Sequence, residues 1–180
     1  MPGRARTLIA ALAALATTAV CGGCGLGAGP GTHGISLTIT RGFGSRPVAS
    51  VTRDRVPGSE TVMRMLERTQ HISTRYGGGF VQSIDGLTGG GRDDWFYYVN
   101  GVQGSRGAAG TAVHAGDHIW WDLHDWSATD SIPAVVGSFP EPFVHGIGGK
   151  RYPVTVECAP GVNASCARVT AALNRAHVPA

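Results

Sequence analysis

Alternating apolar and polar residues predict a β-hairpin around residue 42. Ile35, Leu37 and Ile39 are each followed by Ser or Thr, which is the two-residue period of a half-buried strand. A weaker strand is predicted over residues 48–56, after a turn at 42–47 that contains glycine and proline. We therefore expect these two strands to pair with each other across the turn.

Two aromatic segments give the strongest strand signals in the chain. Residues 94–99 read Asp-Trp-Phe-Tyr-Tyr-Val and end at Asn100-Gly101, a dipeptide typical of a tight type I′ hairpin turn. Residues 118–123 follow a Gly-Asp turn and carry two adjacent tryptophans. The glycine-rich stretch over 72–91 predicts short strands and turns.

Helical spacing of apolar residues predicts a helix over residues 60–70. Ser59 is the predicted N-cap, and Glu60 suits the positive end of the helix dipole. Met63 and Met65 either fill the core or offer a ligand surface, and the core is the simpler interpretation.

The end of the chain predicts a small appendage over residues 150–180. Residues 152–157 alternate as a strand, and 164–176 show one apolar face of a helix. The segment before them, 127–149, has little periodicity and reads as an extended connector. Since a strand and a helix bury too little to fold alone, we expect the appendage to dock on the main domain or to belong to an incomplete α/β unit.

The first 23 residues predict a secretory signal peptide. Two arginines precede an apolar run of about 13 residues, which is shorter than the roughly 20 that a membrane span needs. The sequence Cys21-Gly-Gly-Cys24 resembles a bacterial lipobox, so Cys24 is the predicted site of a diacylglyceryl anchor to the cell membrane. Lipidation of Cys21 and an ordinary cleaved signal are the alternatives. Residues 24–34 then predict a flexible, glycine-rich tether.

Cysteine and charge counts refine this picture. Cys158 and Cys166 remain after the N-terminal pair is assigned, and an even pair in an oxidising compartment predicts a disulfide. The chain has 15 Lys and Arg against 12 Asp and Glu, with no basic run, so nothing in the composition indicates a nucleic-acid partner.

Four motifs in order resemble the transcobalamin C-terminal-like domain family. They are a helix near 61–66, an Ile-Asp-Gly-Leu turn at 84–87, an aromatic strand ending in Asn-Gly, and the Ala-Gly-Asp turn at 115–117 before a Trp-bearing strand. The resemblance covers residues 33–126 and implies a β-grasp. We therefore expect an α+β chain: a β-grasp-like domain at 35–126, with a mixed sheet and one helix, plus the small strand-helix appendage.

The same resemblance implies a ligand-binding role. In the vitamin B12 carriers such a domain closes over cobalamin that a large helical barrel already holds, and the present sequence shows no such barrel. Cobalamin or another corrinoid is thus one expected ligand, and we expect no other cofactor. Many bacterial members of the family have no known function.

The strand that starts at His118 is the candidate metal site. Its even positions share one face, and that face is solvated if the odd positions pack inward. His118, Asp122 and His124 could then hold a divalent metal, with His114 approaching from the preceding loop. The simpler interpretation is a solvated polar face whose histidines are incidental.

The aromatic residues are the better candidates for ligand binding. Some of them should be exposed, because one small core cannot hold them all. The alternative is that they fill and rim the core. The candidates are Trp95, Tyr97, Tyr98, Trp120 and Trp121.

No catalytic motif emerges from the sequence. It has no Gly-x-Ser-x-Gly elbow, and no free thiol remains once the cysteines are assigned. We expect a lipid-anchored, extracytoplasmic module that binds a small ligand and is not an enzyme. The alternative is a cell-envelope module whose aromatic strands bind a protein or polymer, and the sequence leaves both open.

Overall fold

The computed structural model describes residues 31–129 and 131–180 of the 180-residue chain. The predicted signal peptide, both N-terminal cysteines and most of the predicted tether lie outside the described residues. Within them the fold is mixed α+β, with a five-stranded sheet, a three-stranded sheet and two α-helices. Neither described helix combines the length and the apolar character that a membrane span requires.

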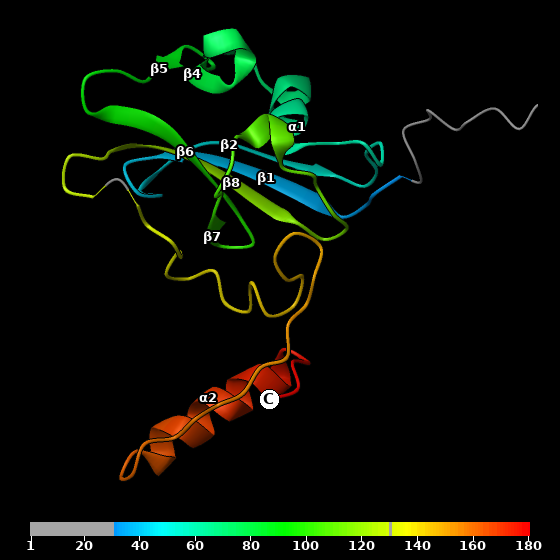
Figure 1. Cartoon of the computed structure of the whole chain (residues 1–180), viewed down its shortest axis with the longest axis vertical. Coiled ribbons are helices and arrows are strands. Elements are labelled where there is room, and N and C mark those ends of the chain that lie inside the picture. Colours follow the sequence, from blue (N-terminus) through cyan, green and yellow to red (C-terminus); the bar gives the residue numbers. More distant parts are fainter. Residues whose placement is uncertain (1–30, 130) are drawn as a thin grey trace, which may run out of the picture.

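The main sheet has the strand order β2-β1-β8-β6-β7 (Figure 1). At its centre β1 and β8 run parallel, and every other pair in the sheet is antiparallel. The first and last strands of the domain are therefore neighbours, and helix α1 crosses one face, which confirms the predicted β-grasp-like arrangement. The bounds are β1 Ile35–Arg41, β2 Arg46–Arg53, β6 Asp93–Val99, β7 Val102–Gln103 and β8 His118–Asp125.

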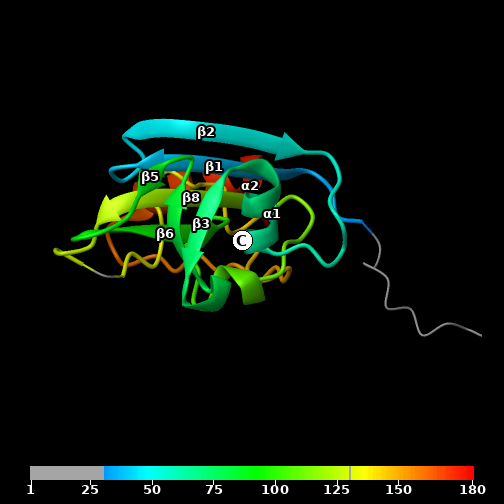
Figure 2. The same ribbon diagram turned by 90° about the horizontal axis from the view of Figure 1, so that it is seen from above.

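Helix α1 (Val62–Thr69) and the smaller sheet cover the same face of the main sheet (Figure 2). That sheet consists of β3 (Ile72–Arg75), β4 (Phe80–Ile84) and β5 (Leu87–Thr88). The core lies between these layers and contains apolar residues of β1, α1, β4, β6 and β8. Met63 and Met65 belong to this core, as the simpler interpretation predicted.

Helix α1 begins later than the sequence predicted. Its N-cap is Thr61, whose hydroxyl accepts from the backbone N–H of Arg64 at 3.2 Å. Ser59 does not cap it, because Glu60 and Thr61 are still extended: Val113 donates to the Glu60 carbonyl, and Thr61 bridges to Ala112. The Glu60 carboxylate is buried and pairs with Arg68 at 2.9 Å instead of lying at the helix terminus.

The hydrogen-bonded domain starts three residues before β1. Thr32 and Val56 exchange two backbone hydrogen bonds of 2.9 and 2.7 Å, and His33 accepts one from Gly116 at 3.0 Å. Of the predicted tether, residues 32–33 are thus fastened to the domain.

The predicted connector is not a free linker. It has almost no regular structure, yet it folds back beneath the face of the main sheet that α1 leaves open (Figure 1). Gln103 holds the beginning of the connector. The backbone N–H of Gln103 donates to the carbonyl of Pro133, and the side-chain oxygen of Gln103 accepts from the backbone N–H of Ile132 at 2.9 Å. Val135 then donates to Gly101 at 2.8 Å.

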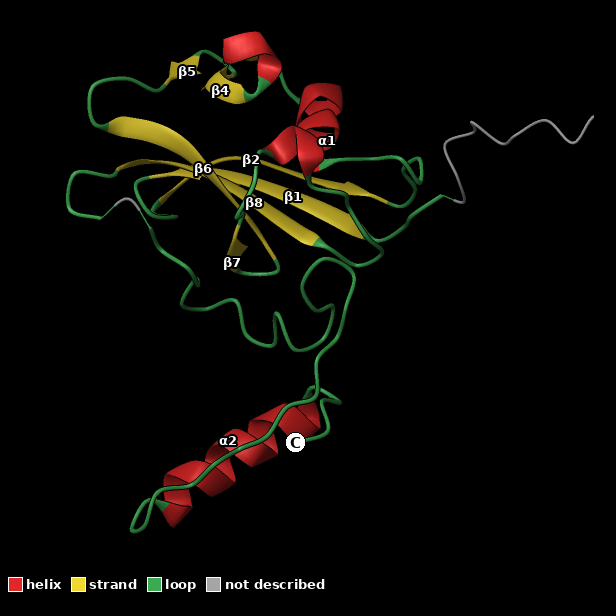
Figure 3. Cartoon of the chain, in the orientation of Figure 1, coloured by secondary structure: helices red, strands yellow, loops and turns green. Residues whose placement is uncertain are grey.

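The C-terminal appendage stands apart from the sheets (Figure 3). It contains helix α2 (Asn163–Arg175) and the predicted Cys158–Cys166 disulfide, which the structure confirms. The predicted strand over 152–157 is wrong: this segment is extended but pairs with no strand, because the described chain supplies none beside it. Of residues 150–180 only Leu173 and Val178 are buried, so the appendage is not docked on the domain.

Candidate functional site

A cleft of about 590 Å³ lies between the main sheet and the connector. Its floor is formed by alternate residues of the two central parallel strands, Ser36 and Thr38 on β1 and His118 and Trp120 on β8. The opposite wall comes from the connector and is largely apolar. Its apolar residues are Val135, Val136, Gly137, Phe139, Pro140 and Val144, and its polar residues are Ser138, Glu141 and His145. A floor of regular strands therefore faces a wall of irregular chain.

Three side chains with metal-ligand chemistry meet at this cleft. His118, Glu141 and His145 each place a potential ligand atom within 4.8 Å of the others. The Glu141 carboxylate accepts from the backbone N–H of His145 at 3.0 Å and also contacts Nδ1 of the His145 ring. The Nδ1 of His118 lies 3.0 Å from the Ser36 hydroxyl. Both imidazoles thus have their Nδ1 occupied by a polar neighbour.

Asn100 holds the two sides of the cluster together. Its Oδ1 accepts from the backbone N–H of His118 at 2.9 Å, and its Nδ2 donates to the carbonyl of Gly146 at 3.0 Å. The same amide donates to the buried carboxylate of Asp117 at 2.8 Å. Because Gly146 follows His145, one fully buried side chain fixes the backbone beside both histidines.

Glycine at position 116 gives the His145 ring its place. A Cβ added there would overlap the imidazole, and the backbone has φ +79°, which is a left-handed conformation that glycine adopts freely. The Ala-Gly-Asp turn therefore leaves space for a histidine from the connector.

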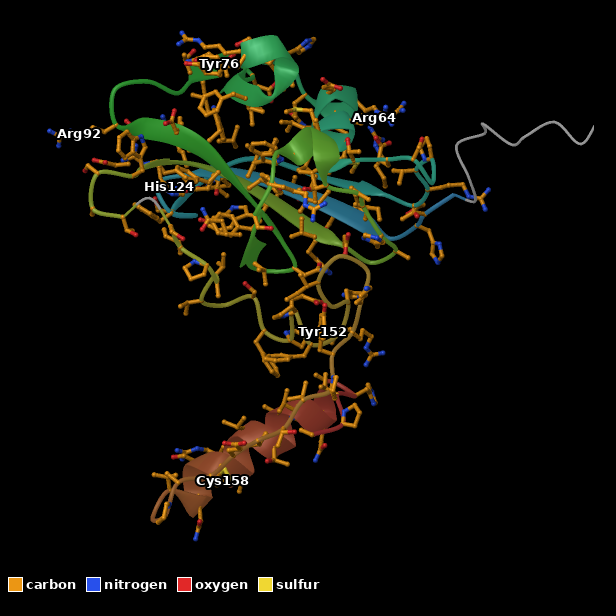
Figure 4. All side chains as sticks on the ribbon, viewed as in Figure 1. Arg64, Tyr76, Arg92, His124, Tyr152 and Cys158 are labelled. Carbon is orange, nitrogen blue, oxygen red and sulfur yellow. A yellow bond between two sulfur atoms is a disulfide. The ribbon has the colours of Figure 1, made fainter. Side chains whose placement is uncertain are left out.

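The structure corrects the predicted metal group of His118, Asp122 and His124. His124 lies near the opposite end of β8 from His118, the first residue of that strand. Asp122 and His124 are buried, with exposures of 0% and 2%, and Figure 4 labels His124. The even face of β8 is not uniformly solvated: the β1–β2 turn and Phe96 cover it at Asp122 and His124, whereas His118 is exposed and Trp120 lines the cleft. The His124 ring lies between Phe43 and Phe96, with centroid distances of 4.4 Å to each.

Asp122 has a structural role in this arrangement. Its carboxylate accepts from the backbone N–H groups of Phe43 and Gly44 at 2.9 and 3.0 Å, from the Thr40 hydroxyl, and from Nδ1 of His124 at 2.8 Å. Burial raises the pKa of Asp122, but these hydrogen bonds outweigh burial and hold the pKa below its ordinary value of 3.8. The carboxylate has about four lone-pair positions, and four hydrogen-bond donors occupy them, so none is left for a metal ion.

His114 is also outside the cluster. Its Nδ1 lies 3.5 Å from the Asp117 carboxylate, and its ring fills the space that Gly149 leaves free. The structure does not bring it to His118 as the sequence suggested.

Most of the predicted aromatic ligand surface is core. Trp95, Tyr97 and Trp121 are buried on the α1 side of the sheet, and Tyr98 is 1% exposed on the other side. Only Trp120 is half-buried and lines the cleft, where it packs on Tyr98 at a centroid distance of 4.7 Å and donates its indole N–H to Thr40 at 2.7 Å.

Glu141 and His145 were missed by sequence reasoning. Their signal was a carboxylate and an imidazole four residues apart, a spacing that brings them together in any helical turn. Here turns supply that geometry: Phe143 donates to Pro140 and Gly146 donates to Pro142 at 3.0 and 2.8 Å. The pair was hidden because the segment has no periodicity to show that it is folded.

Comparisons with known proteins cover part of the chain. No curated protein matches the chain. A crystal structure of a protein from Ruminococcus gnavus ATCC 29149, which carries the provisional description of a metal-binding protein, is similar over 52% of this chain and 97% of its own, with 21% identity and a TM-score of 0.41. Residues 59–125, from three residues before α1 to the end of β8, match the family model described as a domain of unknown function, DUF4430.

Proposed function

We propose that this protein is a non-enzymatic, extracytoplasmic module that binds a small ligand in the cleft between β8 and the connector. The observation that carries the proposal is the cleft itself, since its volume of about 590 Å³ is within the range of small-molecule sites. Like such sites, it combines an apolar lining with a few convergent polar groups. The lipid anchor at Cys24 places the module at the cell membrane in this proposal.

The half-buried Trp120 indicates what kind of ligand the cleft favours. Its ring forms part of the floor, and its N–H is already used by Thr40, so it offers the ligand an apolar planar surface. A molecule with a flat, apolar part fits this floor best. A corrinoid remains one candidate of this kind, because its macrocycle has a flat face.

We expect fluorescence of Trp120 to report this binding. The whole chain, titrated with a panel of planar small molecules that includes cobalamin, should show saturable quenching, because a ligand on the floor contacts the indole. Trp120→Phe should lose most of the response. Trp126→Phe is the matched control, since Trp126 is 38% exposed and does not line the cleft.

Two results would contradict this prediction. One is an unchanged emission spectrum with every member of the panel. The other is an equal response in Trp120→Phe and wild type, which would place the ligand elsewhere.

A second candidate function is the binding of an envelope partner by the connector. Val136 and Phe139 are 101% and 51% exposed, and Phe139 lies 6.5 Å from Phe143 between ring centroids. Clustered exposed apolar residues favour a macromolecular contact. Tyr98 is buried and cannot make such a contact, so of the predicted aromatic candidates only Trp120 is accessible from the cleft.

The anchor is tested independently of the ligand. Cys24→Ala should release the protein into the medium or leave uncleaved precursor, whereas Cys21→Ala should do neither, because only the first removes the acylated residue. Metabolic labelling with a fatty-acid analogue measures this directly. Label kept by Cys24→Ala and lost from Cys21→Ala would move the site to Cys21.

A further inference from the structure

We infer that His118, Glu141 and His145 bind a divalent transition-metal ion of the Zn²⁺ type at one end of the cleft. The inference rests on the proposed cleft, but it does not require an organic ligand to occupy it. The first argument is geometric. Three atoms that all lie within 4.8 Å of one another leave a central point at most about 2.8 Å from each, and Zn²⁺ needs about 2.0–2.2 Å. Side-chain shifts below about 1 Å close that difference.

The second argument is the orientation of the imidazoles. A metal-binding histidine normally uses one ring nitrogen for the ion and hydrogen-bonds the other to a carboxylate or another polar group, which fixes the ring. His118 has Ser36 at its Nδ1, which leaves its Nε2 for the ion. His145 faces the Glu141 carboxylate with its Nδ1, so this nitrogen and the carboxylate would bind the ion side by side in place of their present contact.

The third argument is the burial of the Glu141 carboxylate. Its side chain is only 8% exposed, and within the described residues its recorded donors are the N–H and the ring of His145, which is itself 32% exposed. A buried carboxylate is costly without a positive partner. A dication held by the two histidines supplies that charge at the same place.

The donor set selects the kind of ion. Two imidazoles and one carboxylate suit Zn²⁺ and its neighbours in the first transition series, whereas Mg²⁺ and Ca²⁺ prefer sites made entirely of oxygen. Three protein ligands also leave a coordination position open, as in zinc sites that accept an exogenous molecule. That position belongs to the cleft, because His118, Glu141 and His145 all line it.

The test is isothermal titration of the whole chain with ZnCl₂ after chelator treatment. The protein carries Cys21→Ser and Cys24→Ser and no polyhistidine tag, because free thiolates and tag imidazoles bind zinc themselves. We expect one ion per chain. Glu141→Gln should weaken binding by roughly tenfold or more, because a charged ligand oxygen is replaced by a neutral amide, and His118→Ala or His145→Ala should also weaken it by roughly tenfold or more.

Two controls make the result specific. His71→Ala removes an exposed imidazole outside the cleft and should leave zinc affinity unchanged. Zinc titration is carried out without an organic ligand, and the fluorescence titration is carried out on chelator-treated protein, so the failure of either measurement leaves the other standing. If His118→Ala is too unstable to be titrated, His118→Gln replaces it, because glutamine keeps the approximate volume of the side chain and removes the imidazole.

The inference is overturned if the stripped chain takes up no zinc. It is also overturned if folded His118→Gln and His145→Ala bind zinc as tightly as the parent, or if His71→Ala weakens binding as much as they do.

Discussion

Replacing Asp122 by Asn should lower the free energy of unfolding by about 3 kcal/mol, which is one of the two largest effects that the structure predicts. The carboxylate is fully buried and accepts four hydrogen bonds, from Thr40, His124 and the backbone of the turn at Phe43 and Gly44. An asparagine of the same shape directs its NH₂ group at donors, so hydrogen bonds are lost and buried N–H groups remain unpaired. The midpoint of thermal unfolding should fall by roughly 6–12 °C.

The same substitution should change how stability depends on pH. The pKa of Asp122 is below 3.8 in the fold, so its ionised form stabilises the protein above that value, and this stabilisation is lost as the pH falls through the lower folded pKa. Unfolding by urea at pH 5 and at pH 3 measures this, and the loss between the two should be smaller in Asp122→Asn than in wild type.

Asp93→Asn is the matched control for Asp122. It makes the same chemical change at an exposed position of the same sheet and should stay within about 0.5 kcal/mol of wild type. An Asp122→Asn protein that is as stable as this control would show that the buried network contributes little.

The second large effect is expected at Asn100, where Ala should cost about 3 kcal/mol or more. Three buried hydrogen bonds disappear, including the donor to the Asp117 carboxylate. The residue also has φ +51°, a left-handed conformation that costs alanine about 1–2 kcal/mol. Chemical denaturation gives the loss.

Asn100→Gly separates these two causes. Glycine adopts the left-handed conformation freely, so this variant loses the hydrogen bonds alone, and it should be more stable than Asn100→Ala by about 1 kcal/mol. Both variants release the carbonyl of Gly146, and limited proteolysis should then cut the connector earlier than in wild type. Wild-type resistance to cleavage in both variants would show that Asn100 does not hold the connector.

The sequence predicts the sheet well because local patterns specify it. Alternation identified β1, an aromatic segment after a Gly-Asp turn identified β8, and the Asn100-Gly101 dipeptide marked the end of β6. The parallel pairing of β1 with β8 was not predicted, because no local pattern states which strands pair. The buried methionines followed from helical spacing.

The candidate site could not be predicted in the same way. Periodicity shows that two faces of a strand differ, but it does not show what covers the second face, and Asp122 and His124 were therefore assigned to solvent. The connector was read as a linker because its attachments come from single side chains, Asn100 and Gln103, which leave no repeating signal. A cleft built between a strand and such a segment is visible only in three dimensions.

The wall of the cleft that the connector forms is not part of the hydrophobic core that stabilises the domain. Binding loops generally tolerate insertion and substitution better than the scaffold that supports them. Here the residues that build the domain's core lie on the α1 side of the sheet, whereas residues 135–145 face the cleft and contribute nothing to that core. A change in the length or composition of this segment would alter the ligand while leaving the scaffold intact. Related chains can therefore differ in what they bind, because similarity confined to residues 59–125 includes His118 and Trp120 on the floor of the cleft but not the wall that faces them.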